Sequence, residues 1–498
     1  MKKYIFFVTN QDHWLIAAKK LYEKKIAEPV LWLGDDKHFP EANKLFGDSV
    51  FKDLIHRHRN YLISDIKYNG EYKEFFNSEN YLRAKDRSIK MMDRLDIYGQ
   101  FNRIDREVYF HNLLITYLKK IHDSKPDVLI TAENPHDYPK YIIYEICEYL
   151  EIPCYKFFNW MLSPLLFLQN IQTGEIVKKL HSIPNQINKS FKNDLDQFIV
   201  KLKNDERYEL YYMRNQRISS KILPSIKNFF KKEIIEIIKD FKHNFKMLIK
   251  GIYNPINPFR LNLFTRLFIK KLRSNNLINS FKNNTEEVNI EKDFVYFPLH
   301  YEPEKTTNPD GGFFHDQFLA IVELRKLVPD NIQIIVKEHP SQFYTKMNGS
   351  KGRSPLFYKL IKNVKNIKFI DNKFNSLDLI KKSSLVITIT GSVALEASIL
   401  GKKSLAFGNP WYTGCPNIFS WNKNLSFNQI IDSPISNNTD VINFLNELKI
   451  NFSFPGFING SQRRHFERYV NPHFEKTQNE SIYNILEKLF LIDLQKSE

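Results

Sequence analysis

Residues 385–407 read LVITITGSVALEASILGKKSLAF, and this stretch decides the fold. Its first part, 385–390, is an apolar run typical of a buried strand. A glycine follows, then residues 392–400 have the apolar spacing of a short helix, and a second apolar run covers 403–407. A strand, a helix and another strand in such close succession predict one repeat of a parallel, doubly wound α/β sheet.

The same alternation extends on the N-terminal side of this stretch. Three more bounded apolar runs predict strands, and the segments between them predict helices. The predicted strands are 293–299, 332–337 and 367–370, and the predicted helices are 313–327, 356–363 and 375–382. Residues 289–475 are therefore expected to form a C-terminal Rossmann-like domain, and residues 476–498 a closing helix.

The N-terminal part of the chain shows a second set of such repeats. The predicted strands are 4–8, 29–33, 127–132 and 153–158, and the clearest helices are 106–121 and 138–150. Residues 1–178 are therefore expected to form a first Rossmann-like domain. Two Rossmann-like domains that face a cleft define the GT-B architecture, and the sequence predicts this α/β fold class.

Between the two domains, residues 179–288 lack strand patterns and are expected to be a basic helical insert. Residues 221–250 carry eight lysines against three acidic residues, and apolar side chains recur there every three or four positions. This spacing predicts an amphipathic helix with a cationic face. Such a helix either packs on the protein or docks on an anionic membrane surface.

Composition excludes several classes of protein. The chain has 498 residues, a formal net charge of +17 and three cysteines, too few for a disulfide framework or an all-thiolate zinc site. Its N-terminal apolar run is too short for a signal peptide, and no apolar stretch reaches the roughly 20 residues of a membrane span. No zinc-finger, RNP-like or helix-turn-helix pattern accompanies the positive charge, so nucleic acid is not expected as a partner. We expect a cytoplasmic protein.

The first predicted strand of the C-terminal domain is followed by a histidine and two carboxylates. They are His300, Glu302 and Glu304. Ligands of open α/β sheets bind at the carboxyl ends of strands, so these groups are candidates for a nucleophile, a base or a contact with a donor substrate. A solvated acidic loop is the alternative.

The strand at 332–337 leads into a second candidate, His339, which directly precedes Pro340. A residue before proline is held in an extended conformation, and its imidazole can donate a hydrogen bond to a phosphate. Arg353, in the loop that follows, is a further candidate for the same ligand. A purely structural histidine is the alternative.

The strand at 385–390 ends in Thr390, Gly391 and Ser392, with Glu396 four residues further on. Glycine permits close approach of the backbone, Ser392 is expected to cap the helix, and helix N-terminal amides favour an anion. The two hydroxyls suit a phosphate or a ribose, and the Glu396 carboxylate suits a ribose hydroxyl. A buried helix cap without a ligand is the alternative.

In the N-terminal domain, the strand at 127–132 is followed by Glu133 and His136. An acceptor alcohol becomes a good nucleophile when a base takes its proton, and either side chain could do so. The alternative for this loop is helix capping, with Asp137 as the cap. Residues 10–12, after the first strand, are expected to line the same cleft.

A metal site is not expected. Asp194 and Asp196 match the short DxD string with which GT-A enzymes hold a divalent cation, but that string normally follows a strand. Here it lies in a helical pattern. GT-B enzymes stabilise the departing phosphate with histidine, lysine and backbone amides instead.

Three motifs carry a family resemblance: FPLHYEPEKTT at 297–307, VKEHP at 336–340, and ITGSVALEASILGKKSLAFG at 389–408. They resemble the capsule polysaccharide biosynthesis family, whose members are similar to bacterial Kdo and sialic-acid transferases of GT-B fold.

The resemblance implies specific roles for these motifs. The His-Pro pair and the loop with Thr390, Gly391 and Ser392 would bind the phosphate and ribose of a CMP-sugar. An acidic residue after the first strand of the second domain, here Glu302 or Glu304, would act on the sugar.

The leading hypothesis is therefore a metal-independent glycosyltransferase of capsule or surface polysaccharide assembly. It would use no cofactor, take a nucleotide sugar such as CMP-activated Kdo as donor, and transfer the sugar to a glycan or glycolipid at the inner membrane face. A CDP-polyol phosphotransferase of teichoic-acid type and a non-catalytic membrane-peripheral scaffold are the alternatives.

Overall fold

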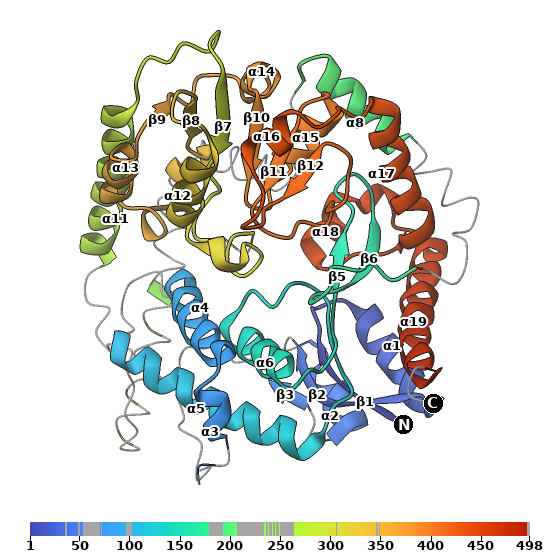
Figure 1. Ribbon diagram of the computed structural model, residues 1–498. Helices are drawn as coiled ribbons and strands as arrows, with labels where there is room; N and C mark the ends of the chain where they lie inside the picture. The colour runs from blue at the N-terminus through green and yellow to red at the C-terminus, as the bar shows by residue number, and fades with distance from the viewer. Residues whose placement is uncertain are drawn as a thin grey trace. The chain divides into compact units, whose positions relative to one another are not determined.

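A computed structural model describes most of the chain, and the described residues form two compact units (Figure 1). The described residues are 1–34, 37–47, 50–52, 70, 72–95, 102–178, 193–206, 234, 235, 238, 242, 245, 249, 263–304, 306–344, 347 and 349–495. Unit 1 comprises Met1–Met92, Arg103–Gln197 and Asn446–Glu498, and unit 2 comprises Asp93–Asn102 and Phe198–Leu445.

The described part of unit 1 contains a seven-stranded sheet in the order β13-β6-β5-β4-β1-β2-β3. Its strands are β1 (Lys2–Phe7), β2 (Ala27–Gly34), β3 (Val50–Lys52), β4 (Val128–Thr131), β5 (Cys154–Asn159), β6 (Leu165–Asn170) and β13 (Phe454–Pro455). Strands β1 to β5 run parallel, and β6 and β13 join the β5 edge in antiparallel fashion. The order of the parallel strands, 3-2-1-4-5, is Rossmann-like.

Unit 1 also contains helices, several of which pack on the sheet because their apolar faces must be buried. They are α1 (Asp12–Glu23), α2 (Phe39–Phe46), α3 (Lys73–Phe76), α4 (Glu79–Leu95), α5 (Arg103–Ser124), α6 (Tyr138–Tyr149), α18 (Gly460–His465) and α19 (Pro472–Gln495). Residues of α19, among them Leu486 and Phe490, share one buried cluster with Tyr4, Phe6 and Trp14. The two ends of the chain therefore form one core.

The described part of unit 2 contains a six-stranded sheet in the order β12-β11-β10-β7-β8-β9, and its strand pairs are parallel. The strands are β7 (Phe294–Pro298), β8 (Gln333–Lys337), β9 (Ile367–Ile370), β10 (Leu385–Thr388), β11 (Ser404–Ala406) and β12 (Ile418–Ser420). This is the complete 3-2-1-4-5-6 order of a Rossmann fold. The prediction of two Rossmann-like sheets is confirmed.

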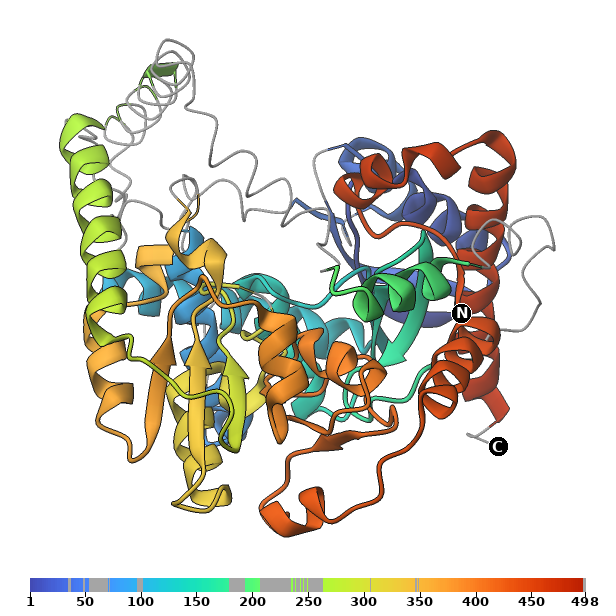
Figure 2. The same ribbon diagram turned by 90° about the horizontal axis from the view of Figure 1, so that it is seen from above.

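The helices of unit 2 alternate with its strands. They are α11 (Leu263–Asn284), α12 (Gln317–Leu327), α13 (Pro355–Lys362), α14 (Ser376–Lys382), α15 (Val393–Ile399) and α16 (Phe427–Ile431), with short 3-10 turns η2 (Gly312–His315), η3 (Pro340–Phe343) and η4 (Gly349–Lys351). Helices α11 and α13 lie side by side near β9 (Figures 1 and 2). Three of the described helices, α4, α8 (Asp194–Lys203) and α17 (Asn438–Phe452), have residues in both units.

The unit boundaries differ from the expected domains at the C-terminal end. Residues 446–475, which were expected in the second domain, belong to unit 1. The reason is pairing over a long distance: β13 hydrogen-bonds to β6, and α19 packs on α1. Most of the expected insert 179–288 that is described groups with unit 2, including α11.

Two local expectations also differ from the structure. The helix expected over 313–327 is interrupted at Asp316, whose carboxylate accepts the N–H of Phe318 and so starts α12 afresh. The basic helix expected over 221–250 lies almost entirely outside the described residues. None of the helices that the structure describes combines the length and apolar content of a membrane span.

The DxD string has a structural role at its first position. Asp194 accepts hydrogen bonds from the Trp160 indole (2.9 Å) and the Ser163 hydroxyl (2.6 Å) and pairs with the buried Lys449 ammonium. Asp196, two residues on, is exposed. The Asp194 carboxylate thus joins the start of α8 to the β5–β6 hairpin and to α17.

We expect Asp194→Ala to reduce the free energy of unfolding by about 3–5 kcal/mol, because it leaves the Lys449 charge buried without a partner. Asp196→Ala is the matched control and should change stability by less than about 0.5 kcal/mol. Urea unfolding followed by tryptophan fluorescence measures both. Equal, small effects of the two substitutions would contradict this role of Asp194.

Candidate functional site

The candidate site of unit 2 lies where its strand order reverses. The chain proceeds from β7 to β8 and β9 on one side and then returns to β10 on the other side of β7. Ligands of such sheets bind outside the carboxyl ends of the strands at this switch point. The loops that follow β7 and β10 begin here, with His300 in the first and Gly391 in the second.

These two loops pack closely against each other. The Thr390 hydroxyl donates to the carbonyl oxygen of Thr306. A Cβ atom on Gly311, in the first loop, would lie 2.9 Å from Ile389 Cγ2, and one on Gly408, in the loop after β11, would lie 2.6 Å from Thr390 Cγ2. Both positions therefore require glycine, and the close packing fixes the path of the backbone through 388–391.

His300 projects from the end of β7 into the turn after β10. Its Nε2 atom lies 3.2 Å from the backbone nitrogen of Ile389, 3.4 Å from that of Thr390 and 3.1 Å from Thr388 Oγ1. Burial of the ring, and secondarily the positive charge of Arg353, lowers its pKa to about 4. The imidazole is therefore neutral at pH 7.

Gly391 and Ser392 complete this turn. The Gly391 N–H donates to Thr388 Oγ1 (2.9 Å), and a Cβ atom on Gly391 would lie only 2.8 Å from that oxygen. Ser392 occupies the N-cap position of α15, but the expected side-chain cap is wrong. Its hydroxyl instead donates to the Glu396 carboxylate at 2.9 Å, which joins the two predicted ribose ligands to each other.

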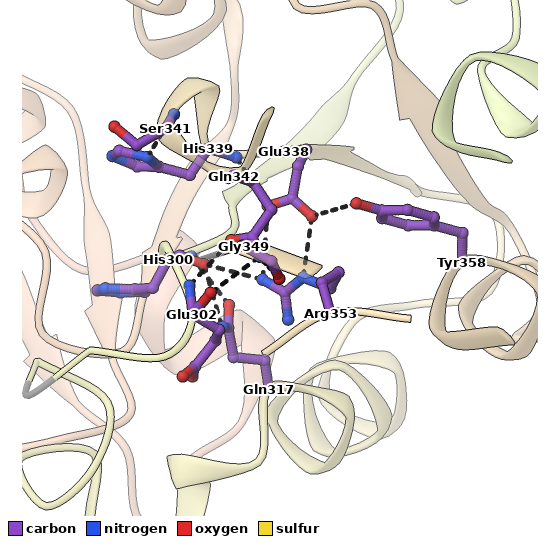
Figure 3. Close-up of polar contacts among 10 residues, drawn as sticks. All are labelled: His300, Glu302, Gln317, Glu338, His339, Ser341, Gln342, Gly349, Arg353 and Tyr358. Carbon is purple, nitrogen blue, oxygen red and sulfur yellow. Dashed lines mark hydrogen bonds and ion pairs between the residues drawn. The ribbon is translucent and has the colours of Figure 1, made fainter. Parts of the chain in front are cut away.

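Two buried glutamines hold the backbone of 300–302 (Figure 3). Gln317 accepts the His300 N–H (2.9 Å) and donates to the His300 carbonyl and to Glu302 Oε1 (3.2 Å each). Gln342 accepts the Glu302 N–H and donates to the Glu302 carbonyl (2.9 Å each), and it also donates to the Gly349 carbonyl. The Glu302 residue is only 4% exposed as a result. Its neighbour Glu304 is half-buried.

Arg353 and Glu338, the residue that directly follows β8, form a buried ion pair (Figure 3). Arg353 Nε lies 2.9 Å from Glu338 Oε2, the side chains are 2% and 0% exposed, and the Tyr358 hydroxyl donates to the same carboxylate oxygen. The guanidinium also donates to the His300 carbonyl at 2.8 Å. This arrangement places Arg353 as a support that joins β7 to β8, which differs from the expected contact with a ligand.

His339 lies at the end of β8, next to that ion pair. Its backbone N–H donates to Glu338 Oε1 (2.8 Å), and its Nδ1 accepts the N–H of Ser341 (3.2 Å). The ring thereby caps the short turn η3, which starts at Pro340. Because Nδ1 is an acceptor, Nε2 carries the proton of the neutral ring and is a hydrogen-bond donor, as a phosphate contact requires.

The second candidate site lies at the switch point of unit 1, between β1 and β4. Residues 10–12 follow β1, and Glu133 and His136, both half-buried, follow β4. The His136 ring contacts the carbonyl oxygen of Asn134 through Nδ1 at 2.8 Å. A carbonyl only accepts, so Nδ1 carries the proton and Nε2 has the lone pair that a general base needs.

Asp137 has the capping role that was the alternative for this loop. Its carboxylate accepts the N–H of Lys140 at the start of α6 and pairs with the Lys140 ammonium at 3.1 Å. The loop therefore combines a helix cap with a histidine in the base-competent tautomer. Glu133 stays a predicted base.

Sequence reasoning missed the residues that hold the predicted ones in place. Thr388, Gln317 and Gln342 contact the site from positions 15 to 88 residues away in the chain. Their polar side chains in apolar surroundings were the available signal, but nothing in the sequence indicates which backbone groups they bind.

Residues 212–433 match the family described as capsule polysaccharide biosynthesis protein. Over this segment, the resemblance drawn from the motifs is confirmed. The capsule-family segment, as we call residues 212–433, contains the switch point of unit 2 with His300, His339, Arg353 and the turn 388–391.

Comparison with solved structures finds matches at low similarity. The chain is 14% identical to the KpsC beta Kdo 2,4 transferase of Thermosulfurimonas dismutans (TM-score 0.22), over 36% of this chain and 54% of that one, so it spans about half of that length. It is 9% identical to the beta Kdo 2,7 transferase of the same organism's KpsC (TM-score 0.29), over 91% and 92% of the chains. It is 12% identical to the UDP-GlcNAc 2-epimerase of Neisseria meningitidis (TM-score 0.19), over the whole of both chains. A search of the curated proteins finds no match.

We expect Arg353→Met to reduce the free energy of unfolding by about 3–5 kcal/mol, because the Glu338 carboxylate stays buried without its cation. Lys365→Met is the matched control: it removes the exposed ion pair with Asp330, and we expect no measurable loss. Chemical unfolding of the three proteins measures the difference. Equal stabilities for Arg353→Met and wild type would refute the supporting role of Arg353.

Proposed function

We propose that this chain is a glycosyltransferase of capsule or surface polysaccharide assembly that takes its sugar from a nucleotide donor. The observation that carries the proposal is the position of the family motifs. The His-Pro pair and the turn with Gly391 follow β8 and β10, at the carboxyl edge of a sheet with Rossmann order, inside the capsule-family segment. Nucleotides bind at this edge in doubly wound folds.

In this proposal, unit 2 binds the donor. His339 donates a hydrogen bond from Nε2 to the phosphate that leaves with the nucleotide, and the turn 390–392 with Glu396 holds the phosphate and the ribose. A donor aimed at the charge that develops on the leaving group stabilises the transition state. The motifs favour a CMP-activated sugar such as Kdo.

The acidic group that acts on the sugar comes from the loop after β7. Glu302 accepts from Gln317 and is buried, whereas Glu304 is the more accessible carboxylate. We therefore assign the sugar contact to Glu304 and a mainly positioning role to Glu302.

Unit 1 binds the acceptor, a glycan or glycolipid. The Nε2 lone pair of His136 takes the proton of the acceptor hydroxyl as that oxygen attacks the anomeric carbon of the donor. The new glycosidic bond forms while the bond from the anomeric carbon to the nucleotide phosphate breaks. A base in hydrogen-bond reach of the attacking hydroxyl contributes about 10²–10⁴-fold to such a step.

We expect His339→Ala to weaken binding of CMP by about tenfold or more, since a hydrogen bond to a charged group is lost. Ser392→Ala should weaken it as well. His122→Ala, at an exposed histidine on α5, is the control and should bind like wild type. Calorimetric titration with CMP measures all four proteins.

A thermal-shift panel of CMP, CDP, UDP and GDP identifies the donor class, because a ligand that binds the native state raises the melting temperature. Stabilisation by CMP alone supports the CMP-sugar. Stabilisation by none of the four, or unchanged CMP affinity in His339→Ala, would overturn the donor site and favour the scaffold.

The proposal includes peripheral attachment to an anionic membrane. Five apolar residues of 221–250 that the structure describes are helical and exposed: Ile234, Ile235, Ile238, Phe245 and Ile249. Four of them, at 234, 238, 245 and 249, have the spacing of one face of an α-helix. Apolar residues on a lysine-rich helix are typical of helices that lie in the interface of an anionic bilayer.

We expect the full chain to sediment with phosphatidylglycerol-containing vesicles at low salt and to be released by high salt. Substitution of both Ile234 and Ile238 by Asp should abolish this binding. Ile104→Asp, at a similarly exposed isoleucine on α5 of unit 1, is the control and should not change it. Equal binding to neutral phosphatidylcholine vesicles would contradict the role of the lysines.

A further inference from the structure

The contacts of His300 define which of its nitrogens carries the proton. Two backbone N–H groups, those of Ile389 and Thr390, point to Nε2 at 3.2 and 3.4 Å. A backbone N–H can only donate, so Nε2 must supply a lone pair. In the neutral ring the proton therefore sits on Nδ1, and the imidazole is an acceptor toward the turn.

The backbone amides of the turn bind this lone pair because they lie beyond the part of β10 that pairs with β7. Strand β10 pairs with β7 only through Leu385 and Val386, and the ladder ends there. The amides at 389 and 390 lie beyond the last paired residue. The His300 side chain takes the place that a strand carbonyl would otherwise have.

Burial makes this acceptor necessary. Ile389 and Thr388 are fully buried, and a buried N–H without an acceptor is costly. Thr388 adds a second link, since its Oγ1 accepts the Gly391 N–H and lies 3.1 Å from Nε2. A Cβ atom on Gly391 would lie 3.2 Å from His300 Cε1, so a glycine here leaves room for the ring.

We propose that His300 is a positioning residue of the nucleotide site: its Nε2 accepts the amides of Ile389 and Thr390 and so shapes the turn from Thr388 to Gly391. The ring links the loop after β7, with its two carboxylates, to the turn after β10. It acts on the nucleotide through that turn, in contrast to the direct contact expected from the sequence. This inference rests on the proposed function only in that the turn binds the donor.

Two substitutions of His300 distinguish the effect of the acceptor atom Nε2 from the effect of the volume of the ring. Glutamine can place its Oε1 near the position of Nε2 and keeps an acceptor for the two amides. Leucine fills a similar volume without one. His300→Gln should bind CMP within about threefold of wild type, and His300→Leu should bind it at least about tenfold more weakly, because a buried donor is left unsatisfied.

Two measurements report on the turn without any nucleotide. Hydrogen exchange of the Ile389 and Thr390 amides should be slow in wild type and His300→Gln, and about tenfold or more faster in His300→Leu. In protein labelled with ¹⁵N-histidine, the resonance lost in His300→Gln should be that of a ring protonated at Nδ1 and unprotonated at Nε2.

The following results would overturn or test the positioning role of His300. A ring protonated at Nε2, or unchanged exchange of the two amides in His300→Leu, overturns the proposal. Equal damage by glutamine and leucine also overturns it, since the acceptor would then not be what matters. If His300→Leu does not fold, the ¹⁵N spectrum and the exchange of His300→Gln decide. If wild type does not bind CMP, the donor assignment fails, and the exchange and ¹⁵N results still test the positioning role.

Discussion

The ion pair between Glu338 and Arg353 is the interaction on which the rest of the unit 2 site depends. Removing two charges from water is expensive, and their attraction offsets this only when further hydrogen bonds satisfy the remaining atoms. Here the carboxylate also receives the Tyr358 hydroxyl and the His339 N–H, and the guanidinium donates to the His300 carbonyl. The pair thereby fixes the ends of β7 and β8 relative to each other.

The remaining contacts extend this support from strand to strand. Gln317 and Gln342 hold the backbone at 300–302, and the His300 ring then reaches from β7 to the turn after β10. The residues that are candidates for binding the donor are thus held in place by buried polar side chains as well as by loop packing. Such support matters for the proposed function, because hydrogen-bond donors aimed at a leaving phosphate are effective only when they are in place before the reaction.

Much of the fold follows from the sequence because parallel strands buried on both faces are continuous apolar runs. The strand at 367–370 has the predicted bounds, and β7, β8 and β10 agree within two residues. The short strands β3, β12 and β13 were missed, and β6 was missed because its apolar run is interrupted by Ser163 and Pro164 just before it. Helix 313–327 breaks at Asp316 through a side-chain cap that outweighs the apolar pattern.

The site was predictable where it depends on topology and not where it depends on distant side chains. His300, His339 and Gly391 follow strands, so their meeting at one sheet edge could be inferred. The pairing of Arg353 with Glu338 could not be inferred from the sequence. A loop arginine has the same sequence signature whether it binds a phosphate or a buried carboxylate. The tautomers of His136 and His339 likewise depend on neighbouring backbone atoms that only the fold brings near.

The shared core of β1 and α19 has a consequence for how the chain folds during synthesis. Tyr4 and Phe6 are synthesised long before Leu486 and Phe490, with which they share one buried cluster. All of unit 2 is synthesised in between and can fold first. On the ribosome, part of the apolar face of the unit 1 sheet therefore stays uncovered until α19 has been made, and chaperones can bind this face during that time.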